Sequence, residues 1–357
     1  MQKKMKRLYY IFLISILLAG CHREQPLRVP DEERPIGLSA EVQSEDDTKA
    51  IINNIIGLTG DGFVVWGSWT QDPEDDSDYT GYYAFGSTNR VFGLRGTKVY
   101  YPDWNYAPLR FWTRGTYTFA AALPASALSS DHSMHNDNIV SGGIAGQMEE
   151  DGTLTLGEWD LKANQADLMV AFDNIDNKDD AMSGSDKVSF LFQHQLAQIA
   201  FKANIAGDNM SSVVINSITL YGNSRTSTQA KFAFDDNGTE TTEDDKIAAN
   251  WTLGAKTTSK TDNFAQATGT WNTSGSTLME GILVFPEAFS FTIVVDYVEA
   301  FGGASAPVSQ TGTVTGTWEA GKKYLYEFTL SSKNIVFSEP VVTPWAASAP
   351  ADDIPPM

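Results

Sequence analysis

Apolar and polar residues alternate with a period of two along most of the chain, which is typical of β-strands that bury one face. In the first such run Ile36, Leu38, Ala40 and Val42 alternate with small or polar residues. Runs rich in β-branched and aromatic residues follow at short intervals. They cover residues 63–69, 117–123, 168–172, 213–220, 230–234, 281–285, 289–297 and 323–330. Sustained helical periodicity is scarce, so the pattern predicts an all-β protein.

One long apolar run permits two interpretations. The stretch from Phe190 to Phe201 is long enough for a helix, but its apolar residues also fit a strand with an irregularity near Ala197. We favour the strand, because strand patterns at regular spacing lie on both sides of it.

The segment 173–186, rich in Gly, Asp and Ser, divides the strand-rich sequence into two parts. A length of 357 residues suggests two domains, although one large β domain is possible. We therefore predict two Greek-key, transthyretin-like β-sandwich domains in tandem, over residues 36–185 and 186–357. Residues 21–35 carry charges and prolines without periodicity and are expected to form a tether.

The chain starts with an export signal. Four basic residues, Lys3, Lys4, Lys6 and Arg7, precede the apolar run from Leu8 to Leu18, which is shorter than a membrane-spanning helix. The run ends in Leu18-Ala19-Gly20-Cys21, and this is the only cysteine in the chain. A thiol at this place predicts a lipoprotein signal over residues 1–20, with acyl chains such as palmitate on Cys21. An ordinary secretory signal is the alternative.

Charge limits the partners. The formal net charge is −20, and the signal segment carries four positive and no negative charges, so the mature chain has −24. This surface repels nucleic acid and anionic lipid. A single cysteine committed to lipid also leaves no disulfide and no thiol nucleophile.

No catalytic motif is recognisable: the chain has no G-x-S-x-G, no H-E-x-x-H, no P-loop and no dinucleotide-binding glycine fingerprint. His132 and His135, with acidic neighbours, are more typical of a polar loop than of a metal site. Asp235 starts a calcium-loop-like run, but Lys246 stands where the glutamate ligand belongs, so Asn237-Gly238 is better interpreted as a hairpin turn. We expect no enzyme activity, no metal and no cofactor.

Aromatic residues make sugar binding a further possible function. Tryptophans such as Trp66, Trp69, Trp104, Trp112 and Trp251 could stack on sugars, although aromatic residues at strand spacing usually belong to the core. His194, within a strand pattern, is expected to be a packed, structural histidine.

Several motifs occur together in an order that resembles the fimbrillins, the lipoprotein subunits of type V pili of Bacteroides-like bacteria. A lipobox precedes a short alternating strand and an acidic linker. The other matching stretches are Arg110-Phe111-Trp112 with Gly115 and Tyr117 to Phe119, Phe192 to Phe201, and the C-terminal series Trp318, Gly321, Tyr324, Tyr326, Leu330, Ile335, Val336, Phe337 and Trp345. The resemblance spans essentially the whole chain.

The resemblance implies that the first strand is a placeholder. A trypsin-like protease at the outer surface of the outer membrane would cut between Lys49 and Ala50 and release the strand and linker, residues 36–49. Release would open a groove in the sheet, which the side chains of Ile36, Leu38, Ala40 and Val42 fill before the cut. The family's best-known processing site follows arginine, so the lysine departs from it; Arg34 is a second basic residue, but a cut there would leave the strand in place.

The resemblance also implies a donor strand in the tail, about residues 334–357, that fills the groove of another subunit. Its groove-filling residues would be Ile335, Phe337, Val341, Thr343 and Trp345. The alternative is a last strand folded back on its own domain. The expected function is therefore a non-enzymatic fimbrial subunit for adhesion or biofilm formation, displayed at the cell surface after periplasmic export, with other fimbrial subunits as partners. Two rivals are a monomeric, lipid-anchored, glycan-binding protein and a secreted hydrolase with convergent carboxylates.

Overall fold

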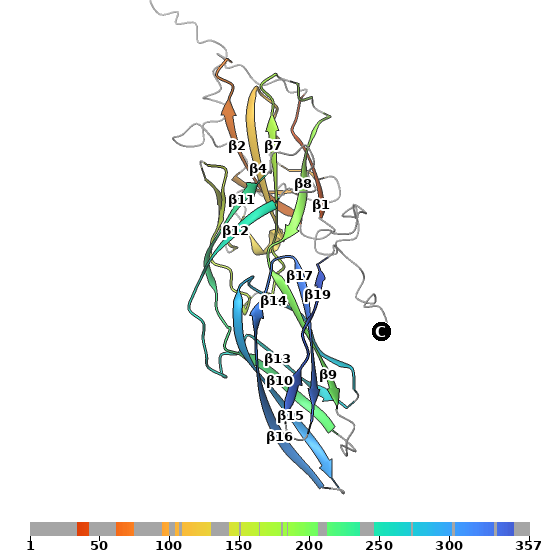
Figure 1. Ribbon diagram of the computed structural model, residues 1–357. Helices are drawn as coiled ribbons and strands as arrows, with labels where there is room; N and C mark the ends of the chain where they lie inside the picture. Colours follow the sequence, from red (N-terminus) through yellow and green to blue (C-terminus); the bar gives the residue numbers. More distant parts are fainter. Residues whose placement is uncertain are drawn as a thin grey trace, which may run out of the picture.

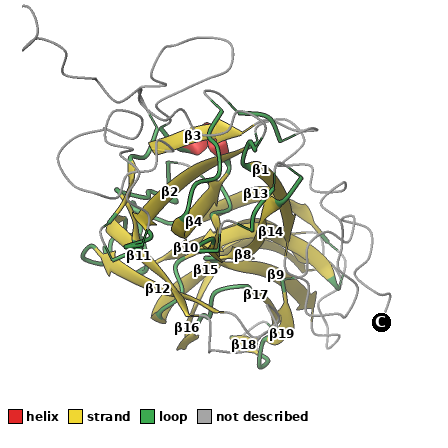
Figure 2. Ribbon diagram, turned by 90° about the horizontal axis from the view of Figure 1, so that it is seen from above, coloured by secondary structure: helices red, strands yellow, loops and turns green. Residues whose placement is uncertain are grey.

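The structure is a computed structural model that describes residues 34–42, 62–74, 95–99, 104–106, 109–129, 143–149, 151–163, 165–179, 181–183, 185–205, 213–235, 246–272, 274–301, 304–331 and 334–345. Strands dominate these residues, and the helical structure among them is a short 3-10 turn, Ala125–Ala127 (Figure 2). The predicted all-β class is thereby confirmed. The described part of the chain has no helix long and apolar enough to cross a membrane.

A six-stranded sheet forms the upper part of the molecule in Figure 1, with the strand order β1-β8-β7-β4-β2-β3. Its strands are β1 (Gly37–Val42), β2 (Phe63–Gln71), β3 (Arg95–Val99), β4 (Gly115–Leu123), β7 (Met169–Asp176) and β8 (Lys187–His194). Neighbours are antiparallel, except that β1 runs parallel to β8. Both faces are buried, because successive residues such as Val64 and Val65 belong to different core clusters.

A four-stranded sheet covers one of these faces, in the order β12-β11-β6-β5. Its strands are β5 (Gly146–Met148), β6 (Leu154–Leu156), β11 (Ser227–Asp235) and β12 (Lys246–Leu253). The strands β11 and β12 form a hairpin that comes from the second half of the chain, and Phe232 of β11 pairs with Leu154 of β6. The two parts of the chain are therefore interleaved, which differs from the simple tandem arrangement predicted. The predicted turn at Asn237-Gly238 lies outside the described residues.

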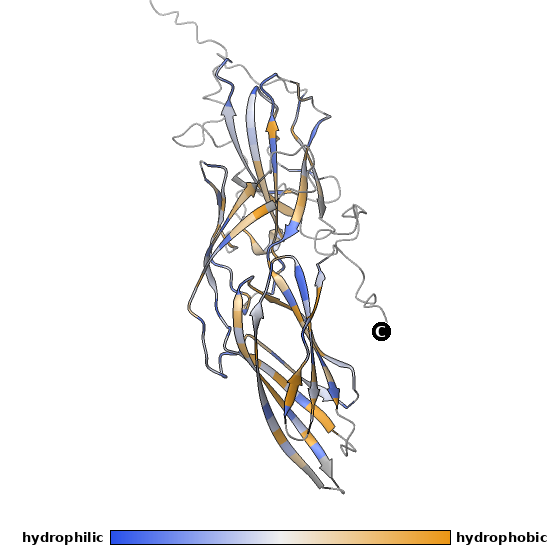
Figure 3. Cartoon of the chain, in the orientation of Figure 1, coloured by the Kyte–Doolittle hydropathy of each residue, from blue (hydrophilic) through white to orange (hydrophobic). Residues whose placement is uncertain are grey.

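The C-terminal part is a second sandwich (lower part of Figure 1). One sheet has the order β13-β10-β15-β16, and the other has the order β14-β9-β17-β18 with β19 also paired to β17. The strands are β9 (Ala197–Ile205), β10 (Val213–Tyr221), β13 (Ala265–Trp271), β14 (Ser276–Val284), β15 (Ala288–Phe301), β16 (Ala304–Thr317), β17 (Lys322–Leu330), β18 (Ile335–Phe337) and β19 (Val341–Pro344). Hydrophobic and hydrophilic residues alternate along these strands, as Figure 3 shows.

The core of this sandwich is rich in aromatic residues. Phe289 stacks on Trp318 with ring centroids 4.0 Å apart, and Phe201 stacks on Tyr326 at 5.2 Å. The indole of Trp318 donates a hydrogen bond to the Tyr326 hydroxyl at 2.9 Å, and burial raises the pKa of Tyr326. The two polar atoms of this aromatic pair therefore satisfy each other within the core.

The chain passes from the first sandwich to the second at Gln195 and Leu196. The strand β8 ends at His194 in the first sheet, and β9 begins at Ala197 in the second sandwich, so the predicted strand with an irregularity near Ala197 is confirmed. The structure thus places the crossing after β8, later than the expected boundary at residue 185. The polar segment before β8 is a connection between β7 and β8, because both strands pair in one sheet.

Candidate functional site

The first strand lies at the edge of the six-stranded sheet, with β8 as its neighbour (Figure 1). Gly37 to Val42 pair in parallel register with Lys187 to Phe192. The side chains of Ile36, Leu38 and Ala40 are 1%, 3% and 8% exposed, and all three belong to one core cluster. For Val42 the structure describes the backbone pairing with Phe192 but not the side chain. An edge strand that buries a whole row of side chains contributes strongly to the core although it has few neighbours in the sheet.

A second segment holds the beginning of β1 from the other side. The Ile36 N–H donates to the Arg110 carbonyl at 2.8 Å, and the Trp112 N–H donates to the Arg34 carbonyl at 3.0 Å. Pro35 and Phe111 form an antiparallel bridge. Residues 34–36 are therefore held by residues 110–112, and β1 that follows them is held by β8, so departure of the whole segment would leave unpaired backbone groups on both partners.

Tyr106 adds a side-chain contact to this segment. Its hydroxyl donates to the Ile36 carbonyl at 2.9 Å and accepts from the Arg110 N–H at 3.3 Å. Burial raises the pKa of Tyr106 to about 12. The tyrosine therefore stays neutral at physiological pH and remains a hydrogen-bond donor to the chain that leads into β1.

The core under β1 is aromatic. Phe63 contacts Phe190 and Phe192 of β8 edge-on, at ring centroid distances of 5.5 and 5.4 Å. Edge-to-face aromatic pairs contribute about 0.5–1.5 kcal/mol beyond the burial of their area. Since these rings belong to the same cluster as Leu38, the groove under β1 is apolar on its floor and preformed by neighbouring strands.

The tail forms an interrupted edge strand at the other end of the chain. In the structure β18 pairs with Phe328–Leu330 and β19 pairs with Lys322–Leu325, both antiparallel to β17. Between them three residues, 338–340, face the two residues 326–327, which is a one-residue bulge at Pro340. The tail is thus paired with its own domain here, and its donation to another subunit stays a prediction.

The bulge shifts the pairing register of β19 by one. Ile335 and Phe337 pack against the C-terminal core, and a Cβ on Gly312 would lie 2.7 Å from the Phe337 ring, so this ring occupies the space above the glycine. Beyond the bulge Val342 is opposite Tyr324 and Val341 is opposite Leu325. Val341 and Val342 are 50% and 49% exposed in this self-paired state, and the groove-filling role of Val341 and Thr343 in a donated strand stays a prediction.

Trp345, which follows β19, contacts the first sandwich. The ring of Trp345 stacks on His194, with centroids 4.2 Å apart and an angle of 11° between the planes. The ammonium of Lys323 lies 5.5 Å from the Trp345 ring centroid, and His194 Nδ1 is 2.8 Å from Asp167 Oδ2. Burial lowers the pKa of Lys323, while the nearby Asp167 acts in the opposite direction. The expectation of a packed histidine agrees with the 7% exposure of the His194 side chain.

The remaining candidate residues divide into two groups. Cys21, Lys49, Ala50, His132 and His135 lie outside the described residues. Trp66, Trp69 and Trp112 are 1%, 7% and 1% exposed and form part of the core, so they do not offer a platform for sugars. Trp104 and Trp251 are partly buried and pack against the two cores of the first sandwich. Within the described residues, no cluster of three or more His, Cys, Asp or Glu side chains could hold a metal ion.

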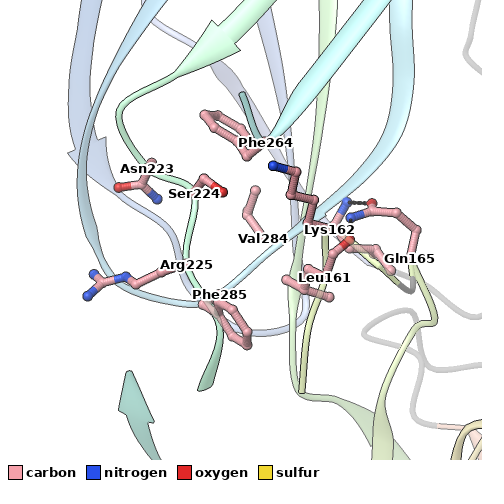
Figure 4. A pocket seen from close by; sticks show the side chains of 10 residues that line it. Leu161, Lys162, Gln165, Asn223, Ser224, Arg225, Phe264, Val284 and Phe285 are labelled. Atoms are coloured by element: carbon pink, nitrogen blue, oxygen red, sulfur yellow. Dashed lines mark hydrogen bonds between the residues drawn. The ribbon is translucent and has the colours of Figure 1, made fainter. Parts of the chain in front are cut away.

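A small pocket lies where the two halves of the chain meet (Figure 4). It is lined by Leu161, Lys162, Gln165, Asn223, Ser224, Arg225, Phe264, Leu283, Val284 and Phe285. None of these is a carboxylate, so the pocket lacks the acidic pair that a hydrolase of the kind considered above requires. Beside it Glu287 accepts from Asn223 Nδ2 at 3.1 Å and pairs with Arg225 and Lys256. Burial lowers the pKa of both cations, and Arg225 adds to the shift at Lys256.

Sequence reasoning missed two features of this site. It did not connect residues 104–112 to β1, and it did not place Trp345 against His194. Neither contact has a periodic signal, since both join residues that are at least 70 positions apart in the sequence.

The fimbrillin-like family model matches residues 48–345, and the chain belongs to this family. Curated proteins gave no match to the chain. Among solved structures, it is similar to a candidate cell adhesion protein from Bacteroides uniformis ATCC 8492, with 15% identity, 87% of this chain and 99% of that chain covered, and a TM-score of 0.40. A candidate cell adhesion protein from Bacteroides ovatus ATCC 8483 has 12% identity, coverage of 89% and 100%, and a TM-score of 0.41. A fimbrial assembly protein from Parabacteroides distasonis ATCC 8503 has 11% identity, coverage of 87% and 98%, and a TM-score of 0.30.

Proposed function

We propose that this chain is a structural subunit of a cell-surface fimbrium. It is exported as a lipoprotein acylated on Cys21, and it polymerises by donor-strand exchange after a protease removes β1. Membership in the fimbrillin-like family supports the fimbrial role. The subunit contributes to adhesion or biofilm formation as part of the polymer, without catalysis of its own.

One observation carries the proposal: β1 is an edge strand whose inward row fills an apolar groove. Burial of an aliphatic side chain such as Ile36 or Leu38 stabilises a fold by about 1.5–3 kcal/mol. Loss of β1 would leave these positions open and would leave the backbone edge of β8 unpaired. An incoming strand restores both contributions, with main-chain hydrogen bonds for affinity and alternate side chains for register.

The donor is the tail, because β18 and β19 already form an edge strand with exposed apolar side chains. Val336, Val341 and Val342 are 54%, 50% and 49% exposed. Pro340 interrupts the pairing, as a proline does in an edge strand, and a short interrupted strand is easier to exchange than a continuous one. Release from β17 and insertion beside β8 of a second copy or of another fimbrial subunit would build a chain of subunits.

The experiment uses the mature chain from residue 21 with Cys21→Ser, with and without limited trypsin. We expect a new N-terminus at Ala50 and a ladder of species on unheated detergent gels. The Lys49→Gln variant is the matched control: it keeps every other basic residue and should yield neither the cut nor the ladder. A second variant that ends at Lys333 should be cut but should form no ladder. Complete cleavage of the parent chain after Lys49 without any ladder would contradict the proposal that the subunit polymerises.

A further inference from the structure

The strand β19 has few contacts of its own. All four residues of β19 are exposed, and β19 pairs with β17 along one edge only. The strand β18 differs, because its Phe337 ring is seated above Gly312. A four-residue strand without buried side chains should fray readily. Some other contact must therefore keep β19 in place.

Trp345 supplies that contact. Its ring stacks on His194 and lies near the Lys323 ammonium, and it packs against the core between the two sheets of the first sandwich. The backbone N–H of Trp345 donates to the Gly321 carbonyl at 2.7 Å, and the backbone N–H of Gly321 donates to the Leu196 carbonyl at 2.9 Å. The residue after β19 is thereby joined, through its backbone and its ring, to the crossing between the two sandwiches.

We propose that Trp345 is a latch that keeps the tail on its own β17 and so opposes its donation. The proposal rests on the function proposed above, in which the tail is the donor. Trp345 is the last residue of the tail that the structure describes, and it follows β19 directly, so β19 cannot leave β17 freely unless the contacts of Trp345 break. Because His194 ends β8, the strand that pairs with β1, the latch joins the donor tail to the strand that lines the acceptor groove.

The test measures hydrogen exchange in the uncut mature chain with Cys21→Ser, where no groove is open and no polymer can form. Trp345→Ala should accelerate exchange of the amides in residues 341–345 by roughly tenfold, the effect of losing one aromatic stack. Thr343→Ala is the matched control, because Thr343 is an exposed neighbour in β19 and its variant should exchange like the parent chain. The strands β10 and β15 serve as internal references that should not change.

Two further variants make the result decisive. Trp345→Phe keeps a ring on His194 and should retain most of the protection, whereas His194→Ala should resemble Trp345→Ala. Equal exchange of residues 341–345 in the parent chain and in Trp345→Ala would overturn the latch. Acceleration across the whole molecule, β10 and β15 included, would overturn it too, because the tryptophan would then stabilise the fold in general.

The outcome is separable from that of the polymerisation experiment. After trypsin treatment, Trp345→Ala should form the ladder faster than the parent chain. Faster exchange without any ladder would leave the latch standing and would refute donor-strand exchange. A ladder formed at the parent rate, despite faster exchange, would show that release of the tail does not limit assembly and would overturn the role of the latch in donation.

Discussion

At the scale of single residues, Tyr106 shows what alternation cannot reveal. The pattern predicted that Ile36, Leu38 and Ala40 face inward, and the structure confirms their burial. It could not predict that a tyrosine 70 residues later would donate to the Ile36 carbonyl. Hydrophobic patterns report which face of a strand is buried, whereas a single long-range hydrogen bond leaves no periodic trace.

Tyr106→Phe should weaken the attachment of β1 without opening a cavity. The change removes one hydroxyl and leaves the buried Ile36 carbonyl without this donor, at a cost of about 1–3 kcal/mol in the free energy of unfolding at neutral pH. Urea unfolding followed by tryptophan fluorescence measures it. A variant as stable as the parent chain would show that the hydrogen bond contributes nothing net.

The raised pKa of Tyr106 also predicts that the free energy of unfolding depends on pH. Burial raises the pKa of Tyr106 to about 12 from an ordinary value of 10.0, so the folded state holds the phenol proton more tightly than the unfolded state does. The stability that this proton contributes is complete below pH 10 and is lost as the pH rises towards 12, by about 1.4 kcal/mol per pH unit. The difference in stability between parent and Tyr106→Phe should therefore shrink between pH 10 and 12. A constant difference over this interval would contradict it.

At the scale of elements, the sequence predicts where strands occur better than it predicts which strands pair with one another in a sheet. The run from Phe190 to Phe201 was predicted as strand with an irregularity, and that irregularity is the crossing from β8 to β9. The pattern could not show that β8 stays in the first sheet, because alternation is equally compatible with either partner. The tail illustrates the same limit: one extra residue at Pro340 shifts the pairing register of β19 by one, and a bulge depends on the partner strand.

The first strand should contribute to stability mainly through its inward row. Leu38→Ala should lower the free energy of unfolding by about 2–4 kcal/mol, since it leaves a cavity over the aromatic floor of the groove. Ser39→Ala is the matched control on the same strand. It removes only a hydroxyl that bonds the Val188 carbonyl at 3.1 Å, and it should cost less than about 1 kcal/mol. Chemical denaturation measures both variants, and equal effects would mean that β1 is not firmly docked in solution.

At the scale of the whole molecule, the two sandwiches are not independent. The hairpin of β11 and β12 leaves the second half of the chain and completes the first sandwich, where Ala230 and Phe232 join Leu154 and Leu156 in one core. Leu283 and Phe285, at the end of β14, reach the same cluster. The sequence predicted two tandem domains because composition and loops mark boundaries along the chain, whereas interleaving depends on pairing between distant strands.

Interleaving predicts that the two sandwiches unfold together. Calorimetry of the mature chain with Cys21→Ser should show one transition, with equal calorimetric and van't Hoff enthalpies. Phe232→Ala in the first sandwich and Phe328→Ala in the second remove rings that are both 0% exposed, each at a cost of about 3–5 kcal/mol. Each variant should shift that single transition as a whole, because unfolding of the second sandwich pulls β11 and β12 out of the first.

Two resolved transitions, of which each variant moves only one, would instead mean that the hairpin detaches easily and that the sandwiches behave as separate domains. Cooperative unfolding would suit a fimbrial subunit, since tension applied through an exchanged strand would be borne by both cores at once.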